Sequence, residues 1–220
     1  MTTHPLVETT PHAHSPRLAR PVRAMAANAA VGLVAAINVA AANHAGVSNE
    51  SVADAALRDF DREALVVAQT AFDAARTGDA VALDALFGQG LPVDVRNQRG
   101  DSLLMLAAYY GQAEAAALLL RRGADPEQTN DRGQTPLAGV AFKGDVAMAA
   151  LLLDGGAQVD GSGPDGKTPL MYAAMFDRVE IVSLLLARGA AAAREEVGGN
   201  TARGLAEAMG AKRAAALLGE

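Results

Sequence analysis

Apolar residues in the last two thirds of the chain come in short runs that are separated by glycine-containing turns. Three of these runs contain three consecutive leucines, at residues 118–120, 151–153 and 184–186. A glycine follows each leucine run at the third position beyond it, at Gly123, Gly156 and Gly189. Glycine just past a helical run supplies the left-handed residue that ends a helix. The pattern therefore predicts a helix over each leucine run that ends before its glycine.

A second apolar run precedes each leucine run and begins at a hydroxyl residue. These residues recur every 33 positions, at Ser102, Thr135, Thr168 and Thr201. Proline follows the hydroxyl at Pro136 and Pro169. A hydroxyl oxygen caps a free amide at a helix start, and the fixed dihedral of proline suits the first helical position. Each unit is therefore predicted to be a helix, a tight turn, a second helix and an extended turn that reaches the next unit.

Glycines mark the same 33-residue period, which identifies the chain as a stacked-repeat protein. One glycine precedes each hydroxyl, and a second stands at the mid-unit turn except where Asp177 replaces it. The two sets are Gly100, Gly133, Gly166 and Gly199, and Gly111, Gly144 and Gly210. A single helix pair cannot bury its apolar face, so the core is expected to form between neighbouring units.

On these residues the chain resembles the ankyrin-repeat family, whose pattern reads D-x-x-G-x-T-P-L-H-x-A-A-x-x-G, then a helix and L-L-x-x-G-A-D. The resemblance implies an all-α solenoid of helix-turn-helix units with extended inter-repeat turns. Where the family usually has a structural histidine after the proline-leucine pair, this chain has Met105, Ala138 and Met171. The high alanine and arginine content is associated with bacterial members of the family.

The period divides residues 65–220 into about five units, at 65–96, 97–129, 130–162, 163–195 and 196–220. The first unit is degenerate, with helices expected at about 65–76 and 80–87. The last has Arg203 where earlier units have leucine, which suits a terminal unit whose outer face meets water. Residues 49–64 are interpreted as a helical lead-in, with a short helix at 51–62 that covers the first unit.

Residues 1–48 differ in composition and are interpreted as a disordered or weakly helical leader. Within it, residues 17–45 place three arginines before an alanine-dominated stretch, an order that is similar to a secretory signal. Asn28 and Asn38 interrupt that stretch, so retention in the cytoplasm is the favoured interpretation. The alternative is export to the periplasm, with cleavage after Ala41 or Ala45. Alanine is also too weakly apolar for us to expect a membrane span.

Composition argues against most chemical functions. The chain has no cysteine, a net charge of −6, and four histidines that all lie in the leader. Nucleic-acid binding needs a dense basic stripe, which is absent, and no phosphate-binding or nucleophile motif appears. We therefore expect no enzyme activity, no cofactor and no metal. The turn residues Asp94, Asp125 and Asp160 are interpreted as local hydrogen-bonding groups. A hydrolase built on the repeats would instead need clustered pocket residues with perturbed pKa values.

The remaining candidate surface lies on the turns and first helices, where the family's pattern leaves positions open. Four of the eight aromatic residues occupy the two positions before the mid-unit turn, at Tyr109, Tyr110, Phe142 and Phe176. Exposed aromatic residues beside arginine and lysine are typical of binding hot spots. The alternative is that Tyr109 and Phe142 are core, which leaves only Tyr110 and Phe176 exposed. The full set of predicted partner-binding residues is Arg99, Asp101, Tyr109, Tyr110, Arg132, Gln134, Phe142, Lys143, Lys167, Met175 and Phe176.

These observations predict a monomeric, non-catalytic scaffold that binds another protein through the concave face of the stack. The alternative is an exported envelope protein that is accessory to a stress-defence enzyme. Two further sets of residues are interpreted structurally. Met105, Met171 and Met209 are expected in the core, and Arg121, Arg122 and Arg188 are expected to interact favourably with helix dipoles, so no binding partner is assigned to them.

Overall fold

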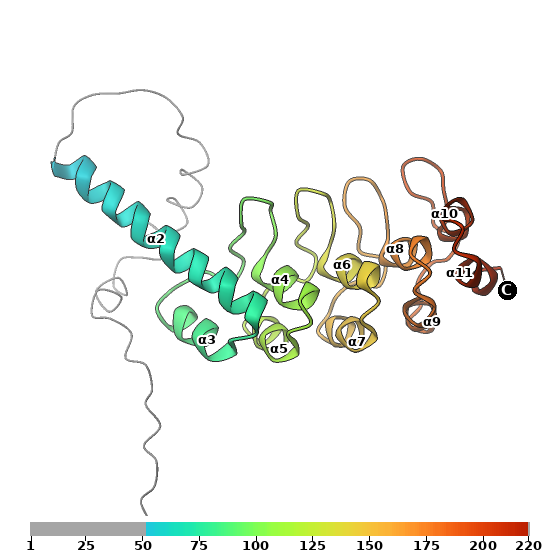
Figure 1. Ribbon diagram of the computed structural model, residues 1–220, viewed down its shortest axis with the longest axis horizontal. Helices are drawn as coiled ribbons and strands as arrows, with labels where there is room; N and C mark the ends of the chain where they lie inside the picture. The colour runs from blue at the N-terminus through green and yellow to red at the C-terminus, as the bar shows by residue number, and fades with distance from the viewer. Residues whose placement is uncertain (1–51, 220) are drawn as a thin grey trace, which may run out of the picture.

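The computed structural model describes residues 52–219, with side chains from Ala64 onward, and this part of the chain is all-helical (Figure 1). Successive helices form antiparallel pairs that stack in one direction, and long turns project from the same side of the stack. The expected all-α solenoid is confirmed. The pairs are α2 (Val52–Thr77) with α3 (Ala80–Gly88), α4 (Leu103–Tyr109) with α5 (Ala113–Arg121), α6 (Pro136–Lys143) with α7 (Val146–Asp154), α8 (Pro169–Met175) with α9 (Val179–Ala187), and α10 (Ala202–Met209) with α11 (Lys212–Leu217).

The four hydroxyl residues begin the first helix of their units, as the sequence predicts. Ser102 Oγ accepts a hydrogen bond from the amide of Met105 at 3.0 Å, and Thr135 Oγ1 accepts one from Ala138 at 3.2 Å. The side chains of Thr168 and Thr201 cap α8 and α10 in the same way. Each cap satisfies an amide that the first helical turn leaves without a partner.

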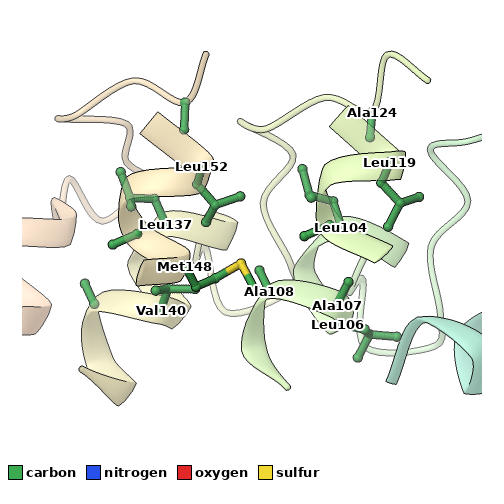
Figure 2. Packing of buried hydrophobic residues seen from close by; sticks show 14 of the residues in the cluster. Leu104, Leu106, Ala107, Ala108, Leu119, Ala124, Leu137, Val140, Met148 and Leu152 are labelled. Atoms are coloured by element: carbon green, nitrogen blue, oxygen red, sulfur yellow. The ribbon is translucent and has the colours of Figure 1, made fainter. Parts of the chain in front are cut away.

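Leucine and alanine fill the space between the helix pairs. Leu104 and Leu119 from one unit and Leu137 and Leu152 from the next are fully buried at equivalent positions (Figure 2). Burial of each leucine side chain contributes about 1.5–3 kcal/mol. Buried alanines such as Ala107 leave little side-chain volume between neighbouring first helices, which lets those helices pack closely.

The N-terminal boundary differs from the expectation. The sequence predicts separate helices at 51–62 and 65–76, but α2 runs without interruption from Val52 to Thr77. Glu63 and Ala64 join the two segments, and both are good helix formers with no glycine or proline nearby. Met209 is a second correction, because its side chain is 55% exposed and is not core. It is the last residue of α10.

Polar side chains also join neighbouring units. Asp125 makes the expected local bond, because its Oδ1 accepts from the amide of Glu127 at 2.9 Å. The expectation is wrong for the other two: Asp94 Oδ1 accepts from the amide of Asp125 at 2.9 Å, and Asp160 accepts from that of Ala191 at 3.1 Å. Two of the three helix-end arginines form ion pairs: Arg122 with Asp84, and Arg188 with Asp154 at 2.8 Å. Apart from the local bond of Asp125, each of these contacts joins one unit to the next.

Asp177 replaces the usual mid-unit glycine and has a role that a glycine could not have. Gly144 holds this turn with φ of 91°, and Asp177 has φ of 54°, the one positive value outside glycine among residues 52–219. Asp177 Oδ1 accepts a hydrogen bond from the amide of Ala214 at 2.8 Å, in the first turn of α11. The N-cap of α11 is Ala211, whose side chain has no acceptor. The fourth unit therefore caps a helix of the fifth.

The expectations about the leader, including its histidines and the signal-like stretch, lie outside the described residues. From α2 to α11, each helix is too short or too polar to cross a bilayer.

Candidate functional site

A groove of about 280 Å³ lies where the projecting turns of residues 97–101 and 130–134 meet the helices α4 and α6. The C-terminal end of α2 closes one side of it. The turns carry the polar part of the lining, and the helices carry the apolar part. The lining residues are Arg76, Arg99, Asp101, Met105, Leu106, Tyr109, Tyr110, Asn130, Arg132, Gln134, Gly139 and Phe142.

The groove brings together seven of the eleven side chains that the sequence predicts for partner binding. These are Arg99, Asp101, Tyr109, Tyr110, Arg132, Gln134 and Phe142. The other four lie outside its lining: Lys143, Lys167, Met175 and Phe176. The predicted surface therefore divides into the groove and a continuation over the third and fourth units.

The aromatic residues form two edge-to-face pairs. Tyr109 and Tyr110 are 38% and 50% exposed, and their ring centroids lie 5.7 Å apart. Lys143 Nζ lies 4.9 Å from the Tyr109 ring centroid, which is within cation–π range. Phe142 is half-buried, and its ring centroid lies 4.5 Å from that of the exposed Phe176 ring. The alternative that makes Tyr109 a core residue is therefore wrong, and Phe142 is only partly covered.

Asparagine side chains fix the shape of the two turns above the groove. Asn97 Oδ1 accepts hydrogen bonds from the amides of Arg99 at 2.8 Å and Asp101 at 3.0 Å. Asn130 Oδ1 accepts the equivalent bonds from Arg132 at 3.0 Å and Gln134 at 3.1 Å. The side chain thus replaces a backbone turn, as asparagine does in Asx turns. A backbone bond of 3.1 Å from the amide of residue 131 to the Arg99 carbonyl joins the two turns.

The charged groups of the groove differ in what they already bind. Asp101 uses both oxygens, because Oδ2 accepts from Asn97 Nδ2 at 3.2 Å and Oδ1 accepts from Asn130 Nδ2 at 3.0 Å. Across residues 64–219, the guanidinium groups of Arg99 and Arg132 make neither an ion pair nor a hydrogen bond, and both residues are exposed. Arg99 and Arg132 are therefore available to a ligand, whereas Arg76 already pairs with Asp73 and Asp101 already accepts two hydrogen bonds.

Gly139 lies in the interior of α6 and opens the floor of the groove. The equivalent positions in the other units carry Leu106, Tyr172 and Leu205. A Cβ atom at Gly139 would lie 3.5 Å from Met105 Sδ and 3.7 Å from Tyr109 Cδ2, so an added methyl group would make ordinary contacts. Comparing the units position by position could have identified this residue from the sequence, because only one unit has glycine there.

The sequence also missed Arg76, Met105, Leu106 and Asn130 as lining residues. Arg76 reaches the groove because α2 ends beside α4, and a partner of Arg76 is the adjacent Asp73. Met105 was expected only as core filler. It is buried, yet it also forms part of the floor. Helical spacing cannot show that a core position lies under an opening.

On the continuation of the surface, several side chains pair with or pack against neighbouring residues. Lys167 Nζ forms an ion pair with Asp165 at 3.0 Å, and this hydrogen bond raises the pKa of Lys167. Burial raises the pKa of the adjacent Tyr172. Met175 is half-buried. This part of the surface is therefore less open than the groove.

The groove contains none of the described side chains whose pKa values are shifted. Besides Lys167 and Tyr172, two side chains on the turns have shifted pKa values. Burial raises the pKa of Glu127, and a hydrogen bond from the backbone amide of Gly198 lowers the pKa of Glu196. Among the residues that the structure describes, no group of three or more histidine, cysteine or acidic side chains is placed to hold a metal ion. Recognition through shape, aromatic surface and positive charge is what this arrangement supports.

Comparison with known proteins gives two matches. A family model described as ankyrin repeats in three copies matches residues 71–162 and 104–196, which together exceed half of the chain. A protein of Pseudomonas aeruginosa, named as an ankyrin repeat protein, is 48% identical over 53 residues. That alignment covers 24% of this chain and 31% of the relative's length.

Proposed function

The chain belongs to the ankyrin-repeat family, and from this premise we propose that it binds another protein between its projecting turns and first helices without catalysing a reaction. Ankyrin repeats are generally protein-binding scaffolds. The family does not determine the partner or the surface, because a fold supports many functions. The proposal of a surface therefore depends on the residues of this chain.

One observation carries the proposal: two exposed tyrosines lie beside two arginines without ion pairs, on turns whose backbone is fixed by hydrogen bonds. Tyrosine and arginine are enriched among the residues that dominate binding energy. Fixed turns also reduce the entropy that is lost when a partner binds. Tyr109 and Tyr110 with Arg99 and Arg132 are the proposed centre of the interface.

The proposed interface continues past the groove. The edge-to-face pair of Phe142 and Phe176 extends the aromatic surface to the fourth unit. Lys143 lies over Tyr109 between the two parts. A partner that covers both the groove and this continuation would contact successive units of the stack.

Affinity capture from the native cells tests this proposal. The tagged full chain is compared with a double variant, Tyr110→Ala with Phe176→Ala. We expect the variant to lose the captured partner, because truncation of an aromatic residue that is a binding hot spot reduces binding by about 2 kcal/mol or more. The matched control is Val81→Ala, an exposed apolar residue of α3 that does not line the groove.

Both variants must retain the circular dichroism spectrum and thermal midpoint of the wild type. If the double variant is folded and captures the same partner as well as the Val81 control does, the proposed surface is wrong.

The proposed setting is the cytoplasm, since Asn28 and Asn38 interrupt the apolar stretch of the leader. The mass of the captured chain tests this point independently of the surface. A full-length mass supports retention, and a chain cut after Ala41 or Ala45 would place the protein in the periplasm.

A further inference from the structure

The two free guanidinium groups occupy the same position in consecutive turns. Arg99 and Arg132 are one repeat apart in the sequence, and Asn97 and Asn130 hold their backbones in the same geometry. Guanidinium is planar and binds carboxylates through paired hydrogen bonds. Both arginines line the same groove, and within residues 64–219 neither guanidinium group forms an ion pair or a hydrogen bond.

Nearby charged groups do not offer an equivalent site for a cationic ligand. Both oxygens of Asp101 already accept amide hydrogen bonds, and the carboxylate of Asp131 lies 3.6 Å from Arg96. Two other cations at this end already have partners, because Lys143 donates to the Tyr109 carbonyl and Arg76, which lines the groove, pairs with Asp73. Charge complementarity thus favours an anionic ligand whose negative groups meet the turns.

Gly139 provides an apolar recess beneath these cations. Leu106 and Tyr172 fill the equivalent position in neighbouring units. Glycine in the interior of a helix lowers stability by about 1 kcal/mol relative to alanine. The recess is bounded by the thioether of Met105 and the ring of Tyr109, and methionine adapts its shape to irregular apolar groups. The groove of about 280 Å³ has room for an apolar side chain of a ligand, which would contact Met105 and Tyr109 there.

We propose that the groove binds an acidic peptide segment of the partner protein, with an apolar or aromatic side chain over Gly139 and neighbouring carboxylates on Arg99 and Arg132. The inference rests on the proposed function and states the chemistry of the partner's binding segment. The carboxylates give specificity for acidic sequences. The apolar side chain supplies the buried area.

Peptide display on the purified full-length chain tests the inference without knowledge of the natural partner. A random peptide library is selected on the wild type, and the enriched peptides are synthesised. We expect a consensus of aspartate or glutamate within two residues of an aromatic or large aliphatic residue. Exchange of the acids for their amides, or of the apolar residue for alanine, is expected to weaken binding at least tenfold.

Two variants place the binding on the groove. The double variant Arg99→Gln with Arg132→Gln removes both charges, and Gly139→Leu fills the recess with the residue that the second unit has there. Both are expected to reduce affinity at least tenfold, and only the arginine variant should also weaken the salt dependence of binding. The controls are Arg121→Gln, an exposed arginine outside the groove, and Gly88→Leu, where an added side chain meets open space.

Several outcomes would overturn the inference: a consensus without acids, peptides that bind the arginine and Gly139 variants as well as the wild type, or no groove-dependent peptide at all. Should Gly139→Leu fail to fold, the arginine variant and the amide peptides decide the question. Failure of this inference differs from failure of the proposed function. Groove-dependent capture of a natural partner together with a non-acidic consensus would reject only the acidic segment.

Discussion

Asp177 offers a test of how neighbouring units stabilise each other. Its backbone has φ of 54° and its carboxylate accepts the Ala214 amide of α11 at 2.8 Å. Replacement by alanine removes the helix cap and places an ordinary side chain in the left-handed region. Replacement by glycine removes only the cap, and replacement by asparagine keeps an acceptor and a residue that tolerates this conformation.

The magnitudes follow from these two contributions. Loss of an N-cap lowers stability by about 1 kcal/mol, and a left-handed non-glycine residue costs about 1–2 kcal/mol. Because the wild-type aspartate already bears part of the left-handed cost, we expect Asp177→Ala to lower the free energy of unfolding by about 1–2 kcal/mol and Asp177→Gly by less than about 1 kcal/mol. Asp177→Asn should lose only the interaction of charge with the helix dipole, about 0.3–1 kcal/mol.

Urea unfolding followed by far-ultraviolet circular dichroism measures these differences. The matched control is Asp145→Ala, which removes a cap within one unit, because Asp145 Oδ1 accepts from Met148 at 3.0 Å and its φ is −84°. That variant should lose about 1 kcal/mol. Amide hydrogen exchange should show the additional loss of protection from Asp177→Ala in α11, since stability in repeat proteins is carried between neighbours.

Two results would refute this reasoning. If Asp177→Ala is no more destabilising than Asp145→Ala, the left-handed conformation contributes nothing measurable. If exchange in α11 is unchanged in Asp177→Gly, the carboxylate of the fourth unit does not cap the fifth.

Three further predictions use the same unfolding assay. Gly139→Ala should raise stability by about 0.5–1 kcal/mol, because alanine is the better helix former and its methyl group fits; a loss of stability would contradict the open floor. Leu152→Ala should lower stability by about 2–5 kcal/mol, because the side chain is fully buried between units; a loss below about 1 kcal/mol would show that the site collapses. Burial raises the pKa of Glu127 above 4.5, so the folded state binds a proton at this group more tightly than the unfolded state does. The stability that this proton contributes is therefore lost as pH rises from 4.5 through the raised pKa. Glu127→Gln keeps an acceptor for the amide of Gln158 and should be more stable than the wild type at neutral pH, with the difference vanishing below pH 4.5; a difference that is independent of pH would contradict the burial effect.

Much of the fold could be predicted because its determinants are local. Ser102, Thr135 and Thr168 cap helices through amides three residues away, so spacing alone locates each helix start. The boundary at α2 could not be located in this way. The repeat period indicates where a unit begins, but α2 continues past that point because nothing in residues 62–65 interrupts a helix.

The candidate site was only partly predictable. The family's open positions identify Arg99 and Arg132, and the aromatic pattern identifies Tyr109 and Tyr110. Neither pattern shows which cations are free. Arg96 and Arg99 look alike in the sequence, yet Arg96 donates to backbone carbonyls in its own turn and the next, and Arg99 does not.

The sequence by itself determined the period, the helix starts at the hydroxyl residues, and the residue types on the turns, because each depends on groups within a few positions along the chain. The tertiary structure decided the rest: that Gly139 opens a groove, that Asp177 caps a helix of the next unit, and which charges remain unpaired. These features depend on contacts between residues about one repeat apart, such as the 2.8 Å bond from Ala214 to Asp177. Only the stacking of units brings such residues together.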